Sequence, residues 1–190
     1  TPTPGAIPVP VEFDQGFLKK FPHRFSNHAE SRSWAASILA GHPVLAADGS
    51  QIMPVRDYSV PIAAIQVAWF LNFHSSDGKY IKDQDLKILT PHDLTVDFDG
   101  DRRISEQEIN LKRFEFETDA LCNQMKPLGR ESLAFLDSSI VITFADKLQP
   151  ELRDAYIKNV LKLLRAAKSS DTPLIGYIDT SYASDLINLI

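Results

Sequence analysis

Acidic residues that follow short apolar runs are the first candidates for chemistry in this sequence. Asp48 follows PVLAA and Asp137 follows LAFL, and a predicted helix between them carries Glu115, Glu117 and Asp119. Oxygen ligands of this kind suit Mg²⁺ or Mn²⁺. Metal-assisted phosphodiester hydrolysis needs several such side chains converging on cations about 4 Å apart. The residues therefore offer a metal-dependent hydrolytic site, provided that the fold brings them together.

Ordinary turns and surface ion pairs are the alternative interpretation of the same residues. Asp48-Gly49 lies between two apolar runs, which is also a good hairpin signal, and Asp137-Ser138 could form a similar turn. On the helix, Glu115 and Glu117 flank the apolar arc on opposite edges, so the helical period does not choose between them. Glu117 could also form an i,i+4 pair with Arg113, worth only a few tenths of a kcal/mol on a surface.

A second acidic stretch, DFDGDRRISEQE at 97–108, resembles the calcium-binding loop of an EF-hand. However, Arg102 stands where that loop needs a glycine. Ser105 and Glu108 have the S-x-x-E spacing of a capping box, which starts a helix without any calcium. We therefore interpret the stretch as a solvated acidic loop that caps the next helix. An EF-hand-like calcium-binding protein stays the weaker alternative.

Composition excludes several classes of protein. The 190 residues are 44% hydrophobic and 24% charged, as expected of one globular domain. No run of about 18 apolar residues occurs, so we expect no membrane-spanning segment, and no secretory signal is visible. A single cysteine, Cys122, fits a reducing compartment and predicts a cytoplasmic protein. The net charge of −5 argues against a protein that coats nucleic acid but not against an enzyme with a carboxylate site.

The elements that must position the carboxylates follow the order βββ-α-β-α-β-α. Residues 1–30 are rich in proline and predict an extended N-terminal arm, with one domain over 31–190. The alternation of strands and helices in the second half favours a mixed central sheet flanked by helices, which is the order of the RNase H-like α/β fold. After a short helix at 31–39, the predicted strands cover 43–48, 59–73, 79–90, 132–144 and 172–181, and the helices 105–125, 151–167 and 181–190.

Four segments together resemble the NurA nuclease family, in the right order from about residue 43 to 190. They are AADGSQIMP, the pattern R-x-x-x-E-x-x-x-L at Arg113, Glu117 and Leu121, LAFLDSS, and PLIGYIDTSYASDLINLI. NurA proteins are metal-dependent DNA exonucleases of RNase H-like fold that work with the HerA translocase. The resemblance implies that Asp48, Glu117 and Asp137 are the catalytic metal ligands. We expect the nucleic acid to contact Arg113 and Ser50.

The resemblance also implies the function. We expect a Mn²⁺- or Mg²⁺-dependent deoxyribonuclease of the 5′–3′ exonuclease type, with single-strand endonuclease activity as a further option, acting in DNA-end resection and repair. The expected partners are DNA, a HerA-type ATPase and a second copy of the chain in a homodimer. A catalytically inactive RNase H-like scaffold that only binds a partner is the alternative.

The chain departs from the family pattern in two places. Asp137-Ser138-Ser139 stands where the family usually repeats D-G-S, which puts the backbone beside Asp137 in question. The family also continues beyond the GYI strand and its helix, and that later region supplies further active-site residues, including a histidine. We therefore expect the chain to lack the C-terminal part of the family domain and, as it stands, to be weakly active or inactive.

Overall fold

A computed structural model of the chain describes residues 21–55, 57, 59–98 and 101–178. The chain divides into two compact units. The first includes residues up to Ile38 and so nearly all of helix α1 (His28–Leu39), and the second is Leu39–Ile178. Most of the predicted arm lies outside the described residues, and α1 begins three residues earlier than the sequence predicted. Within the first unit, the rings of Phe21, His23 and Phe25 gather around Trp34.

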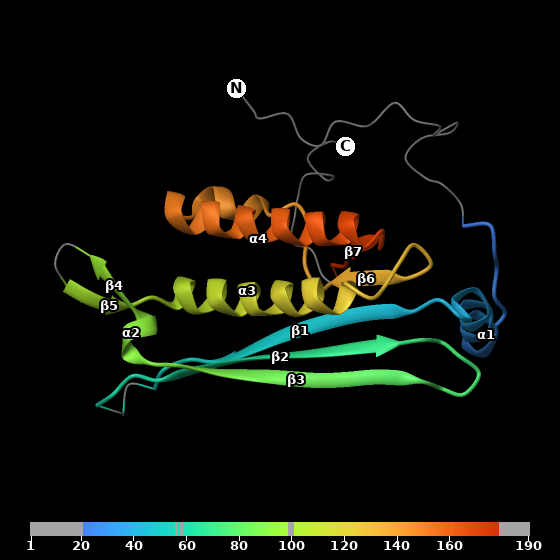
Figure 1. Cartoon of the computed structure of the whole chain (residues 1–190), viewed down its shortest axis with the longest axis horizontal. Coiled ribbons are helices and arrows are strands. Elements are labelled where there is room, and N and C mark those ends of the chain that lie inside the picture. Colours follow the sequence, from blue (N-terminus) through green and yellow to red (C-terminus); the bar gives the residue numbers. More distant parts are fainter. Residues whose placement is uncertain (1–20, 56, 58, 99–100, 179–190) are drawn as a thin grey trace, which may run out of the picture. The chain divides into compact units, whose positions relative to one another are not determined.

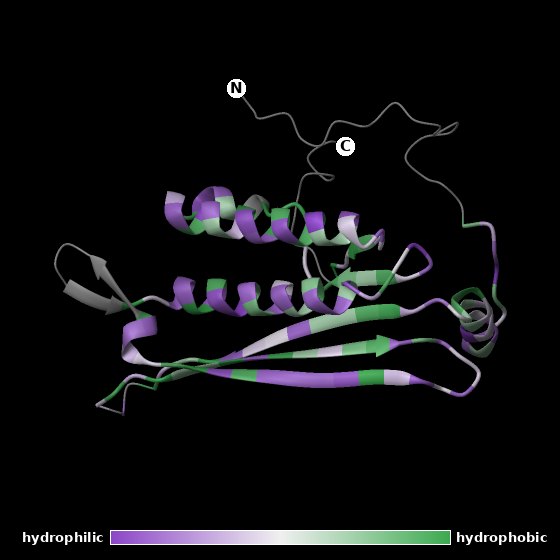
Figure 2. Ribbon diagram, in the orientation of Figure 1, coloured by the Kyte–Doolittle hydropathy of each residue, from purple (hydrophilic) through white to green (hydrophobic). Residues whose placement is uncertain are grey.

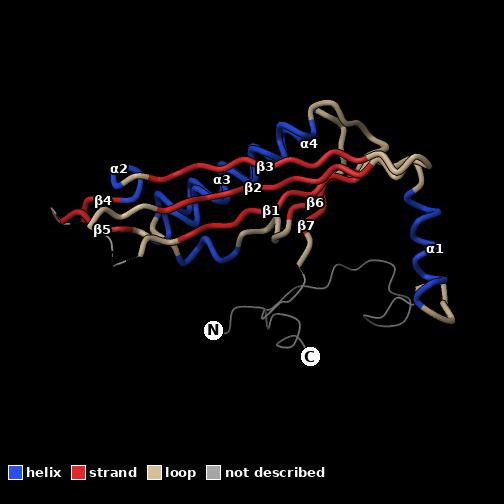
Figure 3. Tube along the Cα trace, turned by 90° about the horizontal axis from the view of Figure 1, so that it is seen from below, coloured by secondary structure: helices blue, strands red, loops and turns tan. Residues whose placement is uncertain are grey.

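The second unit is built on a five-stranded mixed sheet with the order β3-β2-β1-β6-β7. Strands β1 (Val44–Ile52), β2 (Ala63–Asn72) and β3 (Tyr80–Leu89) form an antiparallel meander. The short strands β6 (Leu133–Leu136) and β7 (Leu174–Gly176) extend the sheet parallel to β1. Helices α3 (Glu106–Met125) and α4 (Pro150–Ser169) lie on the same side of it (Figures 1 and 3). The predicted order is confirmed as far as β7, and the helix predicted at 181–190 lies outside the described residues.

The core lies between that face of the sheet and the two helices. Strand β1 alternates, so that Leu45 and Ala47 are buried while Ala46 and Asp48 are exposed. Hydrophilic and hydrophobic residues alternate along the ribbon of helix α4 (Figure 2), as in a helix that packs one face on a core. The buried face predicted for α4 is confirmed: Leu152, Tyr156, Val160, Leu163 and Ala167 are all buried.

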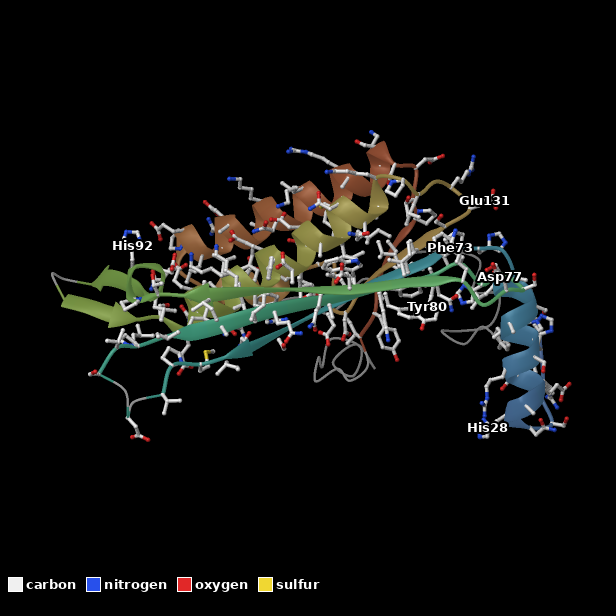
Figure 4. The ribbon with its side chains drawn as sticks, turned by 60° about the horizontal axis from the view of Figure 1, so that its bottom comes forward. His28, Phe73, Asp77, Tyr80, His92 and Glu131 are labelled. Carbon is white, nitrogen blue, oxygen red and sulfur yellow. The ribbon has the colours of Figure 1, made fainter. Side chains whose placement is uncertain are left out.

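The turn between β2 and β3 forms where the segment SSDG predicted it. The Gly78 N–H donates to the Ser75 carbonyl at 3.0 Å, and Gly78 has φ +69°, a conformation that L side chains rarely adopt. Phe73, Asp77 and Tyr80 lie together at this end of the sheet (Figure 4). The turn connects β2 to β3, and the two strands are paired over their full length, from Asn72↔Tyr80 to Ala63↔Leu89.

The stretch 97–108 is not a loop, and that prediction is wrong. A short helix α2 (Pro91–Leu94) leads into a hairpin of β4 (Thr95–Phe98) and β5 (Asp101–Ile104), in the register Phe98↔Asp101. Asp-Gly between two short strand segments is a strong hairpin signal, which the EF-hand resemblance obscured. Asp97 of β4 pairs with Arg102 of β5. The serine half of the predicted capping box is confirmed, because the Ser105 hydroxyl accepts the Glu108 N–H at 3.2 Å, while the Ser105 N–H donates to the Leu94 carbonyl.

The strand predicted at 132–144 is also shorter in the structure. Only LAFL is a strand, and a 3-10 helix η1 (Thr143–Lys147) follows. The Ser139 hydroxyl donates to the Val141 carbonyl at 2.8 Å and accepts the Val141 N–H at 3.1 Å. Local bonds of this kind compete with a sheet ladder for the backbone groups, so the strand ends. Among the described residues, no helix has both the length and the apolar character needed to cross a membrane.

Candidate active site

Asp48 lies within strand β1 and not at its end. The strand continues to Ile52, and Asp48 pairs across the sheet with Ala68 of β2. Both sequence interpretations that ended the strand here, at an aspartate or in a hairpin turn, are wrong. The Asp48 side chain is exposed, so it is available to solvent and to a ligand.

Gly49 is needed because helix α3 comes very close to β1 at this point. A Cβ added to Gly49 would lie 3.0 Å from Arg113 Cγ and 3.2 Å from Glu117 Oε2. A glycine inside a strand often marks such a close approach. The sequence analysis missed this role, although a glycine between Asp48 and a continuing strand pattern was a signal for it.

Glu117 is the buried carboxylate of the site, with 3% of its surface exposed. Burial raises its pKa from 4.5 to about 7; the Arg113 guanidinium opposes this rise, while the negative charges of Asp48 and Asp137 add to it. One charge shifts the pKa of another group in this way only when the two groups lie close together. The structure therefore brings the three predicted carboxylates into one neighbourhood.

Asp137 reaches that neighbourhood through the parallel pairing of β6 with β1. Their register matches Ala47 with Leu136, so Asp48 and Asp137 are the next residues along two adjacent strands. Both side chains are exposed. The two strands thus present a pair of acidic groups beside the buried Glu117.

The serine that follows Asp137 does not disturb the backbone. Among the described residues, only His74 and Asp171 are non-glycine residues with positive φ. The backbone at Ser138 therefore does not have the positive φ that would require a glycine. The glycine of the GYI segment, Gly176, is needed for space, because a Cβ there would lie 2.8 Å from the Ser138 carbonyl oxygen. Strand β7 therefore packs its backbone directly against the residues that follow Asp137.

The other two acidic candidates on the helix, Glu115 and Asp119, bond to helix α4 and not to the site. The Glu115 side chain accepts a hydrogen bond from Asn159 of α4 at 3.2 Å, and Asp119 pairs with Lys162 of the same helix. Glu117 faces β1 instead, which resolves the choice that the helical period left open. Ser50 is an exposed residue of β1.

Arg113, predicted to contact nucleic acid, binds inside the site. Its Nη1 donates to the Gly49 carbonyl and to Glu117 Oε2, each at 3.1 Å. The i,i+4 ion pair foreseen from the sequence is thus present, with Glu117 buried and Arg113 partly exposed. Asp48, Glu117 and Asp137 supply the all-oxygen donors that Mg²⁺ and Mn²⁺ prefer. Among the residues described, however, no three His, Cys, Asp or Glu side chains are already gathered as a group that could hold a metal ion.

Comparison with known families identifies the chain. A family model described as the NurA domain matches residues 42–190. The chain belongs to the NurA family. Together with the mixed sheet and its flanking helices, this confirms the resemblance and the RNase H-like α/β fold, both predicted from the sequence. Membership of this family supports a nuclease. A search of curated proteins found no match.

Solved structures similar to this NurA chain are RNase H proteins. RNase H1 from Halobacterium salinarum NRC-1 is 12% identical, with 77% of this chain and 90% of that chain covered and a TM-score of 0.35. LC11-RNase H1, solved in complex with an RNA/DNA hybrid, is 10% identical, with 72% and 83% covered and a TM-score of 0.36. The N-terminal RNase H domain of a Mycobacterium tuberculosis protein, solved as a maltose-binding-protein fusion, is 13% identical, with 79% and 94% covered and a TM-score of 0.36.

Gly49→Ala is expected to disturb the site without unfolding the protein. The new methyl group would meet Arg113 and Glu117 at 3.0 and 3.2 Å, so both side chains must move by a few tenths of an ångström. We expect DNA cleavage to fall by roughly tenfold, because displaced catalytic groups lose much of their effect. Gly129→Ala is the matched control, because its Cβ would meet nothing within 4 Å. Equal activity in both variants would contradict this role for Gly49.

The stability of the NurA chain in EDTA is expected to depend on the protonation of Glu117. Its folded pKa of about 7 lies above the ordinary 4.5, so the folded state binds this proton more tightly than the unfolded state does. That stabilisation is fully present below about pH 4.5 and is lost as the pH rises through about 7. Glu117→Gln cannot ionise. The unfolding free energy of the wild type should therefore fall relative to that of the variant by roughly 2–3 kcal/mol between about pH 5 and pH 8. Urea unfolding at both pH values tests this, and a constant difference would contradict it.

Proposed function

We propose that this NurA chain is a Mn²⁺- or Mg²⁺-dependent deoxyribonuclease of the 5′–3′ exonuclease type that processes DNA ends. Asp48, Glu117 and Asp137 are its catalytic metal ligands. One observation carries the proposal. Glu117 of α3 lies beside Gly49, the residue after Asp48, and its raised pKa reflects both its burial and the charges of Asp48 and Asp137.

The chemistry of the three residues supports a metal site rather than a structural cluster. Arg113 compensates only one of the three negative charges, so the cluster still favours a further cation, and perturbed carboxylates of this kind gather at functional sites. When bound, divalent cations activate a water nucleophile and stabilise the leaving oxygen of the phosphodiester. Glu117 contributes a ligand fixed by burial, while the exposed Asp48 and Asp137 can rotate toward the cation and the DNA.

A cleavage assay with end-labelled DNA tests the proposal. Single- and double-stranded DNA labelled at either the 5′ or the 3′ end is incubated with the protein and Mn²⁺, Mg²⁺ or EDTA. An RNA/DNA hybrid serves as a further substrate. We expect DNA degradation, slow in the chain as it stands, that requires Mn²⁺ or Mg²⁺ and releases the 5′ label first. Cutting of only the RNA strand of the hybrid would contradict a deoxyribonuclease. DNA binding without cleavage under any condition would favour the inactive scaffold.

Family resemblance extends the proposal to partners. A HerA-type translocase would deliver DNA ends, and a homodimer would present two sites, in the cytoplasm. Light scattering of the purified chain measures the dimer directly. Co-purification with a HerA-type ATPase tests the complex, and a monomer that binds no such ATPase would remove both partners from the proposal without affecting the nuclease assignment.

A further inference from the structure

Arg113 is the one cation that bonds directly to the carboxylate site among the described residues. Its Nη1 bridges the Gly49 carbonyl and Glu117 Oε2, at 3.1 Å each. The side chain is 30% exposed and that of Glu117 only 4%. The stem of Arg113 also lies against Gly49, with Cγ 3.0 Å from an added Cβ. Arg113 therefore ties α3 to β1 and takes one oxygen of the buried carboxylate.

This bond places two cations in competition for one ligand. A divalent ion held with Asp48 and Asp137 also needs Glu117, and a guanidinium within a few ångströms of that ion repels it. Among the described residues, no three ligand side chains form a group that could hold a metal ion, and one oxygen of Glu117 is bonded to Arg113. Arg113 thus compensates the buried charge of Glu117 and occupies an oxygen that a divalent cation would need.

We infer that Arg113 is a positioning residue, which holds Glu117 against β1 and yields Oε2 when a divalent cation binds with Asp48 and Asp137. The inference rests on the proposed metal site. It replaces the expected role of Arg113 as a nucleic-acid contact. Arg113 then also determines the concentration of divalent cation at which the site is occupied.

Mn²⁺ binding to the whole 190-residue chain, without DNA, tests the competition. Free Mn²⁺ is measured by electron paramagnetic resonance for the wild type and three Arg113 variants. Arg113→Gln keeps an amide donor for the Gly49 carbonyl but removes the charge, and Arg113→Met removes both. We expect each neutral variant to bind Mn²⁺ at least about threefold more tightly than the wild type. Arg113→Lys, which keeps the charge, should stay near the wild type. Circular dichroism shows whether each neutral variant folds, and one folded neutral variant is enough for the test.

A double-mutant cycle shows whether the effect acts through Glu117. Combining Arg113→Gln with Glu117→Gln should abolish the gain in Mn²⁺ affinity, because the two residues then no longer compete or pair. A gain of the same size in both backgrounds would mean that Arg113 acts by general charge alone, and would overturn the positioning role.

DNA binding in EDTA separates this role from a phosphate contact. Fluorescence anisotropy with a fluorescein-labelled single-stranded oligonucleotide should give dissociation constants within about twofold for the wild type and Arg113→Gln. A clear loss of DNA affinity with unchanged Mn²⁺ affinity would overturn the inference, as would weaker Mn²⁺ binding. If the wild type binds Mn²⁺ and cleaves DNA while the Arg113 variants bind Mn²⁺ as the wild type does, only this inference fails. If the wild type neither binds Mn²⁺ nor cleaves DNA, the proposed function fails as well.

Discussion

Asp48→Asn and Asp137→Asn are each expected to lower Mn²⁺-dependent DNA cleavage by at least about a hundredfold, because each removes the charge of a proposed direct ligand. The amide has nearly the same shape as the carboxylate, and both side chains are exposed. The fold should therefore be unaffected. The rate of release of label from the 5′ end of DNA, compared at equal protein concentration, measures the effect.

Stability measurements distinguish this loss from unfolding. The charges of Asp48 and Asp137 raise the pKa of Glu117, so removing either one relieves a repulsion. At neutral pH the melting temperature should stay the same or rise. Asp85→Asn is the matched control, because Asp85 is an exposed aspartate on edge strand β3. Near-normal turnover in a folded Asp48→Asn protein would remove the basis of the proposed nuclease site.

Glu117→Gln is expected to be far more damaging than Glu115→Gln, although the two residues are neighbours on one helix. Glu117 is buried against Gly49 beside the two aspartates, so the amide loses a metal ligand and about a hundredfold in rate. Glu115 faces α4 and accepts a hydrogen bond from Asn159. A glutamine there keeps an acceptor, and the rate should stay within about threefold of the wild type.

Mn²⁺ binding without DNA provides a second measure of the same pair. Glu117→Gln should weaken Mn²⁺ binding, and Glu115→Gln should leave it unchanged, since only Glu117 lies with the aspartates. If Glu115→Gln were the inactive variant, the metal site would have to lie between α3 and α4. That outcome would reject the β1 site altogether.

The sequence by itself determined the order of the elements and the buried face of α4. Local and periodic signals carry this information: the capping box at Ser105, the turn SSDG, and apolar residues at helical spacing. It also named Asp48, Glu117 and Asp137 together, through the resemblance to NurA proteins. Those signals act within a few residues of one another, so no knowledge of the tertiary packing was needed to find them.

Tertiary structure decided what local signals left open. Asp-Gly predicts a turn in isolation, yet Asp48-Gly49 lies within a strand, because pairing with Ala68 and Val67 of β2 holds it extended. The helical period places Glu115 and Glu117 equally well. Only the packing of α3 between β1 and α4 turns one toward the aspartates and the other toward Asn159. The nucleic-acid contact predicted for Arg113 stays a prediction, and the structure adds a bond from Arg113 to the buried Glu117 and to the Gly49 carbonyl. The pairing of β1 with β2 and the packing of α3 against β1 and α4 join residues distant in the chain, and such contacts arise only when the sheet and helices pack.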